Sequence, residues 1–215
     1  MTSQLERAVA VMDRLRSPGG CPWDAEQTHA SLARYLLEET YEVLEAIETD
    51  DAALLREELG DLLLQVLFHA RIAEEDADPY SIEDVAGDLV DKLVRRHPHV
   101  FESASASDAD AVNEAWEWQK ITEKGRTSAL DGVPLAQPAL ALAAKLQARA
   151  NRAGLDVAPE SGDEIGERLF AVVRDAVAAG VDPEGALRRT TREYRDKIAA
   201  AEHAAGHGGN SRRPH

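Results

Sequence analysis

Apolar residues recur at helical spacing along most of the chain, and no strand-like alternation of period two persists anywhere in it. The pattern predicts helices over these ranges: 3–16, 31–48, 53–76, 82–97, 112–124, 138–153, 163–179 and 183–202. Several boundaries carry the expected signals. Ser81 with Asp84 resembles a capping box, and Gly154 and Gly180 follow the last residues of two helices. We therefore expect an all-α protein.

The helices expected over 31–48 and 53–76 differ in polarity. The first has apolar residues on one side and acids on the other, as in an ordinary helix with a solvated face. The second is apolar around almost its whole circumference, which predicts a buried helix. Its polar side chains share one strip roughly 80° wide, at about 100° per residue. That strip holds Glu58, Asp61, Gln65 and His69.

Carboxylates recur at one-turn spacing on both helices. They are Glu38, Glu39 and Glu42 on the first and Glu58 and Asp61 on the second. A buried carboxylate costs several kcal/mol or more unless its charge is compensated. Only two bases, Arg56 and Arg71, lie between residues 34 and 92. A divalent cation is the remaining compensator, and oxygen ligands favour Mg²⁺, with Mn²⁺ as a substitute, over zinc.

Basic and aromatic residues elsewhere leave alternatives open. Lys92 and Arg96 share a helix face, with Arg95 beside them, and they form either a surface salt-bridge patch or a phosphate clamp. Trp116 and Lys120 lie one turn apart. They are either a packing residue and a surface charge, or a pair that stacks a base and holds a phosphate.

The segment CPWDAEQTH, residues 21–29, reads as a loop. Trp23 in it is either a plug over the core or the aromatic wall of a nucleobase site. In the second case Asp24 and Gln27 are its hydrogen-bonding neighbours.

Composition narrows the possible partners. The chain has 215 residues, with 24 Lys and Arg against 40 Asp and Glu, and a formal charge of -16. The electrostatic field of this negative charge repels nucleic-acid polymers and anionic membranes, so we expect neither as a partner. Cys21 is the single cysteine, no apolar run reaches membrane-spanning length, and the N-terminus has no secretory signal. We expect a cytoplasmic protein.

The two acidic segments resemble a known family. EETYE (Glu38–Glu42), a spacer and EELGD (Glu57–Asp61) are similar to the EExxE…ExxD signature of the MazG family of nucleoside triphosphate pyrophosphohydrolases. CPWDAEQTH, LLLQVLFHARIAEE, RRHPHVF and SALDGVPLAQPAL resemble further stretches of that family. The resemblance implies a dimerising, all-α four-helix core. It also implies Mg²⁺-dependent hydrolysis of nucleoside triphosphates to monophosphate and pyrophosphate, for cleaning or control of nucleotide pools.

The resemblance also implies roles for individual residues. Metal ligation falls to Glu39, Glu42, Glu58 and Asp61. Phosphate contacts fall to Lys92 and Arg96, and the Trp–Lys pair to Trp116 and Lys120. Glu38 is the candidate to orient or deprotonate the attacking water.

The second half of the chain carries a faint repeat of the acidic motif. Glu164 and Glu167 echo Glu58 and Asp61, but no acids match those of the first helix, so this copy is expected to be a non-catalytic packing module. The expected organisation is a MazG-like catalytic helical domain over 1–124, a linker over 125–138, a degenerate second copy over 139–203 and a disordered tail over 204–215.

Two other functions are weighed against hydrolysis. A ferritin-like di-iron protein needs two Glu-x-x-His motifs on bundle helices, and the only candidate before the tail, Glu26 to His29, falls in a predicted loop. A non-catalytic helical module that binds nucleotides is the other alternative. Nucleotide binding in the presence of Mg²⁺ without hydrolysis would favour it.

Overall fold

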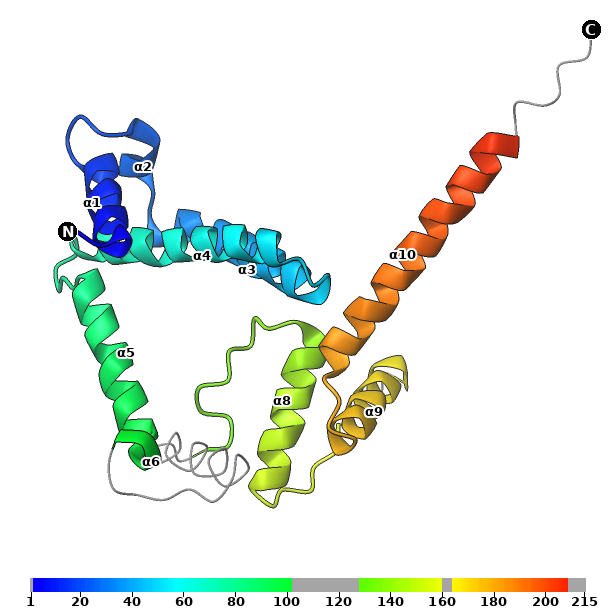
Figure 1. Ribbon diagram of the computed structural model, residues 1–215. Coiled ribbons are helices and arrows are strands. Elements are labelled where there is room, and N and C mark those ends of the chain that lie inside the picture. The colour runs from blue at the N-terminus through cyan, green and yellow to red at the C-terminus, as the bar shows by residue number, and fades with distance from the viewer. Residues whose placement is uncertain (1, 102–127, 160–163, 209–215) are drawn as a thin grey trace, which may run out of the picture. The chain divides into compact units, whose positions relative to one another are not determined.

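The computed structural model describes residues 2–101, 128–159 and 164–208, and within these ranges it contains helices and no strands (Figure 1). The expected all-α class is therefore confirmed. The chain divides into two units, Met1–Trp116 and Glu117–His215. The helix expected over 112–124, with Trp116 and Lys120, lies outside the described residues.

In the described part of the first unit, the four expected helices occur in order, together with two short helices that were not expected. They are α1 (Gln4–Arg16), α2 (Pro22–Glu26), α3 (His29–Glu48), α4 (Ala52–Ala73), α5 (Ile82–Arg96) and α6 (Pro98–Phe101). The expected loop over 21–29 is wrong in part, because Pro22 begins a short helix there. The capping box of Ser81 and Asp84 is present at the start of α5.

A tight turn makes α3 and α4 antiparallel neighbours (Figure 1). Asp50 adopts the left-handed region, with a φ of 57°. The Asp51 side chain then accepts hydrogen bonds at 3.0 Å from the backbone N–H groups of Ala53 and Leu54, which caps α4. The turn places the acids of α3 opposite those of α4.

The core lies where α1, the first half of α3 and the second half of α4 meet. Its buried members are Met12, Leu32, Leu67, Phe68 and Ile72. The carboxylates of α3 and α4 come from the other half of the same helix pair. The scaffold is thus packed at one end and polar at the other.

The expectation that α4 is buried all round is wrong for the single chain. Leu59 is 50% exposed and Val66 is 41% exposed. The reason is geometric, because α3 and α1 make most of the contacts of α4 and leave one of its sides uncovered. Beyond Ile82, which packs against the core, large apolar residues of α5 are exposed as well: Val85, Leu89, Val90, Leu93 and Val94.

The second unit contains α8 (Ala139–Arg152), α9 (Glu164–Ala178) and α10 (Pro183–Gly208). The buried Gln147 of α8 donates from Nε2 to the carbonyl oxygen of Phe170 on α9 at 2.9 Å. The last helix, expected to end near residue 202, continues to Gly208. None of the helices in the described ranges is long and apolar enough to cross a membrane.

Candidate metal centre

Three carboxylates converge between α3 and α4. Glu39 of α3 and Glu58 and Asp61 of α4 each offer an oxygen, and these oxygens all lie within 4.8 Å of one another. Glu58 and Asp61 are three residues apart, so they share one face of α4. Glu58 is 9% exposed, while Glu39 and Asp61 are half-buried. The structure therefore brings together three of the four metal ligands that the resemblance implies.

Glu42, the fourth, adjoins this group, because its carboxyl lies close enough to Glu39 and Glu58 to raise the pKa of both. Burial raises the pKa of Glu39, and its bond to Glu42 and the charge of Asp61 raise it further. Burial also raises the pKa of Glu58, followed by the charges of Glu42 and Asp61. Both shifts have the same origin, because carboxylates crowded together away from water disfavour one another's charge.

The donor set fits a hard divalent cation. All four side chains offer carboxylate oxygen, which suits Mg²⁺ or Mn²⁺ better than zinc. Within the described ranges, no other group of three His, Cys, Asp or Glu residues comes together in this way. In the second unit, the sequence of α8 contains no acid that could match Glu164 and Glu167 of α9.

Glu38 is exposed on α3 and is not part of the converging group. As the neighbour of Glu39, its side chain leaves the helix about 100° away from that ligand. It is thus a solvent-exposed acid next in sequence to a ligand of the cluster.

Trp23 combines features of both interpretations made for it. Its ring packs edge-on against Tyr35 and Phe68, with centroid separations of 6.1 and 6.4 Å, yet the residue is 50% exposed. Tyr35 precedes Glu39 by four residues on α3, a rise of about 6 Å along the helix. Trp23 therefore contacts α3 about one helical turn before Glu39. Asp24 presents its backbone carbonyl to Arg16.

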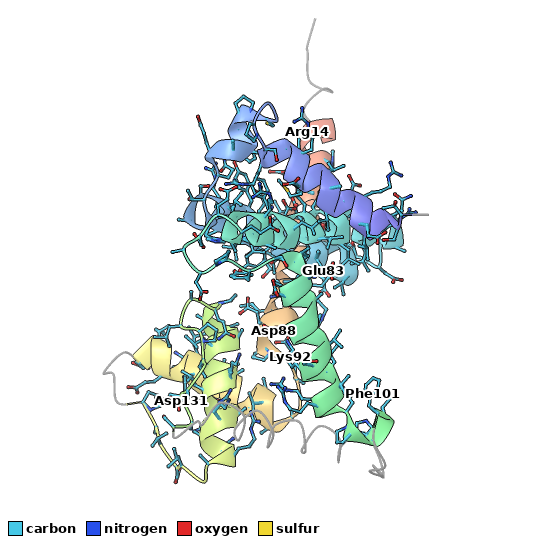
Figure 2. All side chains as sticks on the ribbon, turned by 90° about the vertical axis from the view of Figure 1, so that its left-hand side faces the viewer. Arg14, Glu83, Asp88, Lys92, Phe101 and Asp131 are labelled. Carbon is cyan, nitrogen blue, oxygen red and sulfur yellow. The ribbon has the colours of Figure 1, made fainter. Side chains whose placement is uncertain are left out.

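The basic cluster lies elsewhere in the single chain. Lys92, Arg95 and Arg96 belong to the second half of α5, which leads away from the α3–α4 pair (Figures 1 and 2). Lys92 is exposed on that helix. The described part of one chain does not bring this cluster beside the acids.

Two polar features near Trp23 were missed by sequence reasoning. His29 and His69 stack, with ring centroids 5.0 Å apart, and the side chain of Arg16 is buried against Glu75. Both pairs join segments 40 or more residues apart, and no local pattern reports such a contact. Pairing with His69 also places His29 outside the acidic cluster, so the Glu26-x-x-His29 motif does not build a di-iron site.

Comparisons with known proteins agree with the motif. The family profile described as the MazG nucleotide pyrophosphohydrolase domain matches residues 27–101. An uncharacterized 26.1 kDa protein of Streptomyces cacaoi is 55% identical, covering 93% of this chain and 83% of that protein.

Two relatives carry functional names. The nucleoside triphosphate pyrophosphohydrolase of Mycobacterium tuberculosis is 49% identical, covering 94% of this chain and 59% of the relative. The nucleoside triphosphate pyrophosphohydrolase/pyrophosphatase MazG of Thermotoga maritima is 39% identical, covering 92% of this chain and 85% of the relative. The chain thus spans most of the second relative and less than two thirds of the first.

Proposed function

Because the chain belongs to the MazG nucleotide pyrophosphohydrolase family, we propose that it hydrolyses nucleoside triphosphates to a monophosphate and pyrophosphate with Mg²⁺, or Mn²⁺ in its place. The observation that carries this proposal is the convergence of Glu39, Glu58 and Asp61 within 4.8 Å. The raised pKa values of Glu39 and Glu58 support it, because a cation bound at the same oxygens would relieve the repulsion among these carboxylates.

In this proposal Glu39, Glu42, Glu58 and Asp61 hold the metal. The metal supplies charge neutralisation for the triphosphate and lowers the pKa of water. Glu38, on the solvent side, orients the water that attacks the α-phosphorus and accepts its proton. Lys92, Arg96 and Lys120 stabilise the negative charge on the departing pyrophosphate, with Arg95 beside them.

We propose that the protein works as a homodimer. Within one chain the basic residues of α5 and the acids of α3 and α4 stay apart. The uncovered apolar sides of α4 and α5 give a second copy a surface to bury, and about 25 cal/mol per Å² of apolar area favours such burial. Sedimentation of the full chain tests this, since a monomer at micromolar concentration would contradict it.

The base lies against the exposed half of Trp23 in this arrangement, and Trp116 provides the second aromatic surface. Stacking of this kind positions every base, with a strength that differs from base to base, so it gives a graded preference among nucleotides. The role that fits is cleaning or control of nucleotide pools. We place this work in the cytoplasm, where nucleoside triphosphates are used and a chain with one cysteine needs no disulfide.

The decisive experiment identifies the first product. A panel of standard and modified nucleoside triphosphates is incubated with the full chain and Mg²⁺, and pyrophosphate and orthophosphate are measured separately. Pyrophosphate as the first product is expected. Orthophosphate released first contradicts the proposed cleavage, and tight nucleotide binding without any product would favour the non-catalytic module instead. Asp61→Asn serves as the inactive control and Glu45→Gln, an exposed acid of α3, as the matched active one.

A further inference from the structure

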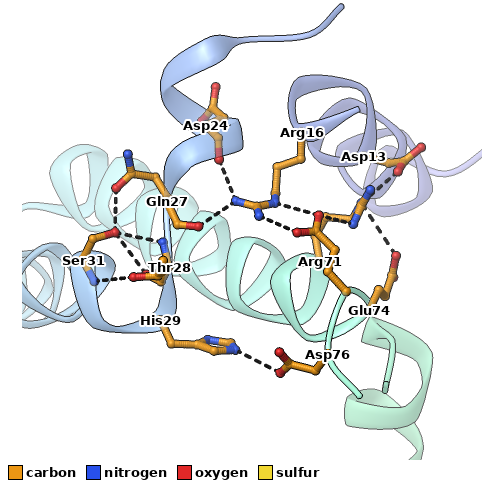
Figure 3. A network of polar contacts seen from close by, with 11 residues as sticks. Asp13, Arg16, Asp24, Gln27, Thr28, His29, Ser31, Arg71, Glu74 and Asp76 are labelled. Carbon is orange, nitrogen blue, oxygen red and sulfur yellow. Dashed lines mark hydrogen bonds and ion pairs between the residues drawn. The ribbon is translucent and has the colours of Figure 1, made fainter. Parts of the chain in front are cut away.

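Arg16, the last residue of α1, is held on two sides. Its side chain is only 4% exposed. On one side Nη2 and Nε donate to the two carboxylate oxygens of Glu75, at 2.8 and 3.2 Å (Figure 3). On the other side Nη1 donates to the carbonyl oxygens of Asp24 and Gln27, at 2.6 and 3.0 Å. One guanidinium thus joins α1, the segment after α4, and helix α2 with its two capping residues, 21–27, which we call the α2 turn.

The α2 turn depends on such contacts for its position. Its helix has five residues, none of them buried, and is too short to be stable by itself. The chain just before α2 passes close to α1, since a Cβ at Gly20 would clash with the carbonyl oxygen of Leu15. The two carbonyl bonds from Arg16 therefore help to fix its orientation, alongside the ring contacts of Trp23 with Tyr35 and Phe68.

The same contacts continue to Trp23. Gln27, whose carbonyl accepts from Arg16, donates from Nε2 to the carbonyl oxygen of Trp23 at 2.9 Å. The backbone of Trp23 is therefore linked to Arg16 through one residue. Its ring meets Tyr35 and Phe68 edge-on and the residue is 50% exposed, so a shift of the backbone beneath the ring would change its angle.

We propose that Arg16 is a positioning residue that fixes the angle of the Trp23 ring and thereby sets substrate affinity and discrimination between bases. Arg16 does so without touching the substrate or the metal. The inference rests on the proposed function in one respect, namely that Trp23 forms a wall of the nucleobase site.

A neighbouring ion pair provides the matched control. Arg71 donates from Nε to Asp13 of α1 at 2.8 Å, and from Nη1 to Glu75 at 2.8 Å (Figure 3). The Asp13–Arg71 pair joins α1 to α4, as Arg16 does, but makes no contact with the α2 turn. Asp13→Asn therefore weakens the junction of the two helices and spares the carbonyl bonds.

Arg16→Lys has the opposite effect. A lysine ammonium is a single point charge, so it can stay near Glu75 but cannot span the carboxylate and both carbonyl groups at once. The variant keeps the charge of the junction and releases the turn.

The first measurement reads the position of Trp23 without using activity. In the full chain carrying Trp116→Phe and Trp118→Phe, Trp23 is the sole tryptophan. Arg16→Lys in this background should red-shift its emission and raise its quenching by acrylamide, while Asp13→Asn should leave both at the parent values. Equal quenching in the two variants would overturn the positioning role.

The second measurement is of steady-state kinetics with the nucleotide panel. It uses chains that keep all three tryptophans, at a temperature below the melting temperature of each variant. Arg16→Lys should raise KM about tenfold, equivalent to about 1.4 kcal/mol of lost binding, and narrow the spread of KM across the panel of bases. Its kcat and its Mg²⁺-dependent melting shift should match the parent, and Asp13→Asn should match it throughout. Equal losses of kcat in both variants would mean that Arg16 is only structural.

Two further variants keep the outcomes separable. If Arg16→Lys melts below the assay temperature, Glu75→Gln is used instead, because it weakens the Arg16–Glu75 ion pair from the α4 side. Acrylamide quenching of Trp23 should increase in this variant too. Unchanged quenching would overturn the inference. Unaltered base discrimination in Trp23→Ala instead overturns the nucleobase wall of the proposed function. In that case the quenching result alone decides whether Arg16 holds the turn.

Discussion

The imidazole rings of His29 and His69 lie parallel, with an interplanar angle of 3° and their Nδ1 atoms 2.7 Å apart. At this distance one Nδ1 donates a proton and the other accepts it, so both rings cannot be charged while the contact lasts. His29 Nε2 faces Asp76 at 3.8 Å, whereas His69 Nε2 is buried with no hydrogen-bond partner among the described residues. His69 is therefore the ring that stays neutral.

Acid should weaken the fold through His69. Burial lowers the pKa of His69 below 6.5, and the charge of His29 lowers it further. At a pH between the folded and the unfolded pKa of His69, the unfolded chain binds more protons than the folded chain. The contribution of neutral His69 to the free energy of unfolding is therefore complete above pH 6.5 and is lost as the pH falls below it. The melting temperature of the parent minus that of His69→Gln should shrink from about pH 7.5 to about pH 5.5. A pH-independent difference would contradict this.

Removing a carboxylate should abolish turnover and spare the fold. Asp61→Asn and Glu42→Gln each keep the side-chain volume and remove one charge from a crowded cluster, so the metal-free protein should melt at the same temperature or slightly higher. Hydrolysis should fall by about a hundredfold or more. Added Mg²⁺ should raise the melting temperature of the parent and of Glu45→Gln, and much less that of the two variants. Matched losses of activity and melting temperature would indicate a structural role.

Metal affinity should fall in acid. The pKa values of Glu39 and Glu58 are raised from 4.5, so protons compete with Mg²⁺ at a higher pH than ordinary carboxyl groups allow. In the metal-free protein the same shift acts in the opposite direction to His69, since the fold gains stability as the pH falls through a raised carboxyl pKa. Calorimetry in two buffers of different ionisation enthalpy should detect protons released on Mg²⁺ binding, and fewer in Glu58→Gln. Proton-free binding in the parent would refute the competition.

The basic residues of α5 should act on the substrate alone. Arg96→Ala should cost about 1.5–3 kcal/mol of transition-state stabilisation, roughly a ten- to hundredfold loss of kcat/KM, because a charge-assisted phosphate contact is lost. The Mg²⁺-dependent melting shift should persist, because the carboxylates bind the metal directly. Lys197→Ala, an exposed base of α10, is the control. A surface salt-bridge role predicts parent-like turnover in Arg96→Ala and a stability loss below about 1 kcal/mol.

Local chemistry made much of the fold predictable. Ser81 with Asp84, and the glycines at 154 and 180, mark helix ends by rules that act within a few residues, and the structure has helix ends there. The acids of α3 and α4 were also predictable as a group, because helical spacing and one tight turn suffice to bring them together.

Long-range and intermolecular features were not predictable in this way. The Arg16–Glu75 pair spans 59 residues, and its geometry depends on how α1 packs on α4. The burial of α4 on all sides was wrongly predicted for a related reason. A helix that is apolar all round indicates burial without saying whether its own chain covers every side, and Val66 stays 41% exposed here.

The uncovered sides of α4 and α5 tie the behaviour of the protein to its concentration. In the proposed homodimer, burial of these sides against the partner contributes to the folding free energy of each chain. Dilution dissociates the dimer by mass action, and that contribution is then lost. Specific activity should then drop at low enzyme concentration, as free chains expose Leu59, Leu64 and Val90 to water. The cell's supply of active enzyme would consequently rise faster than linearly with the number of chains synthesised.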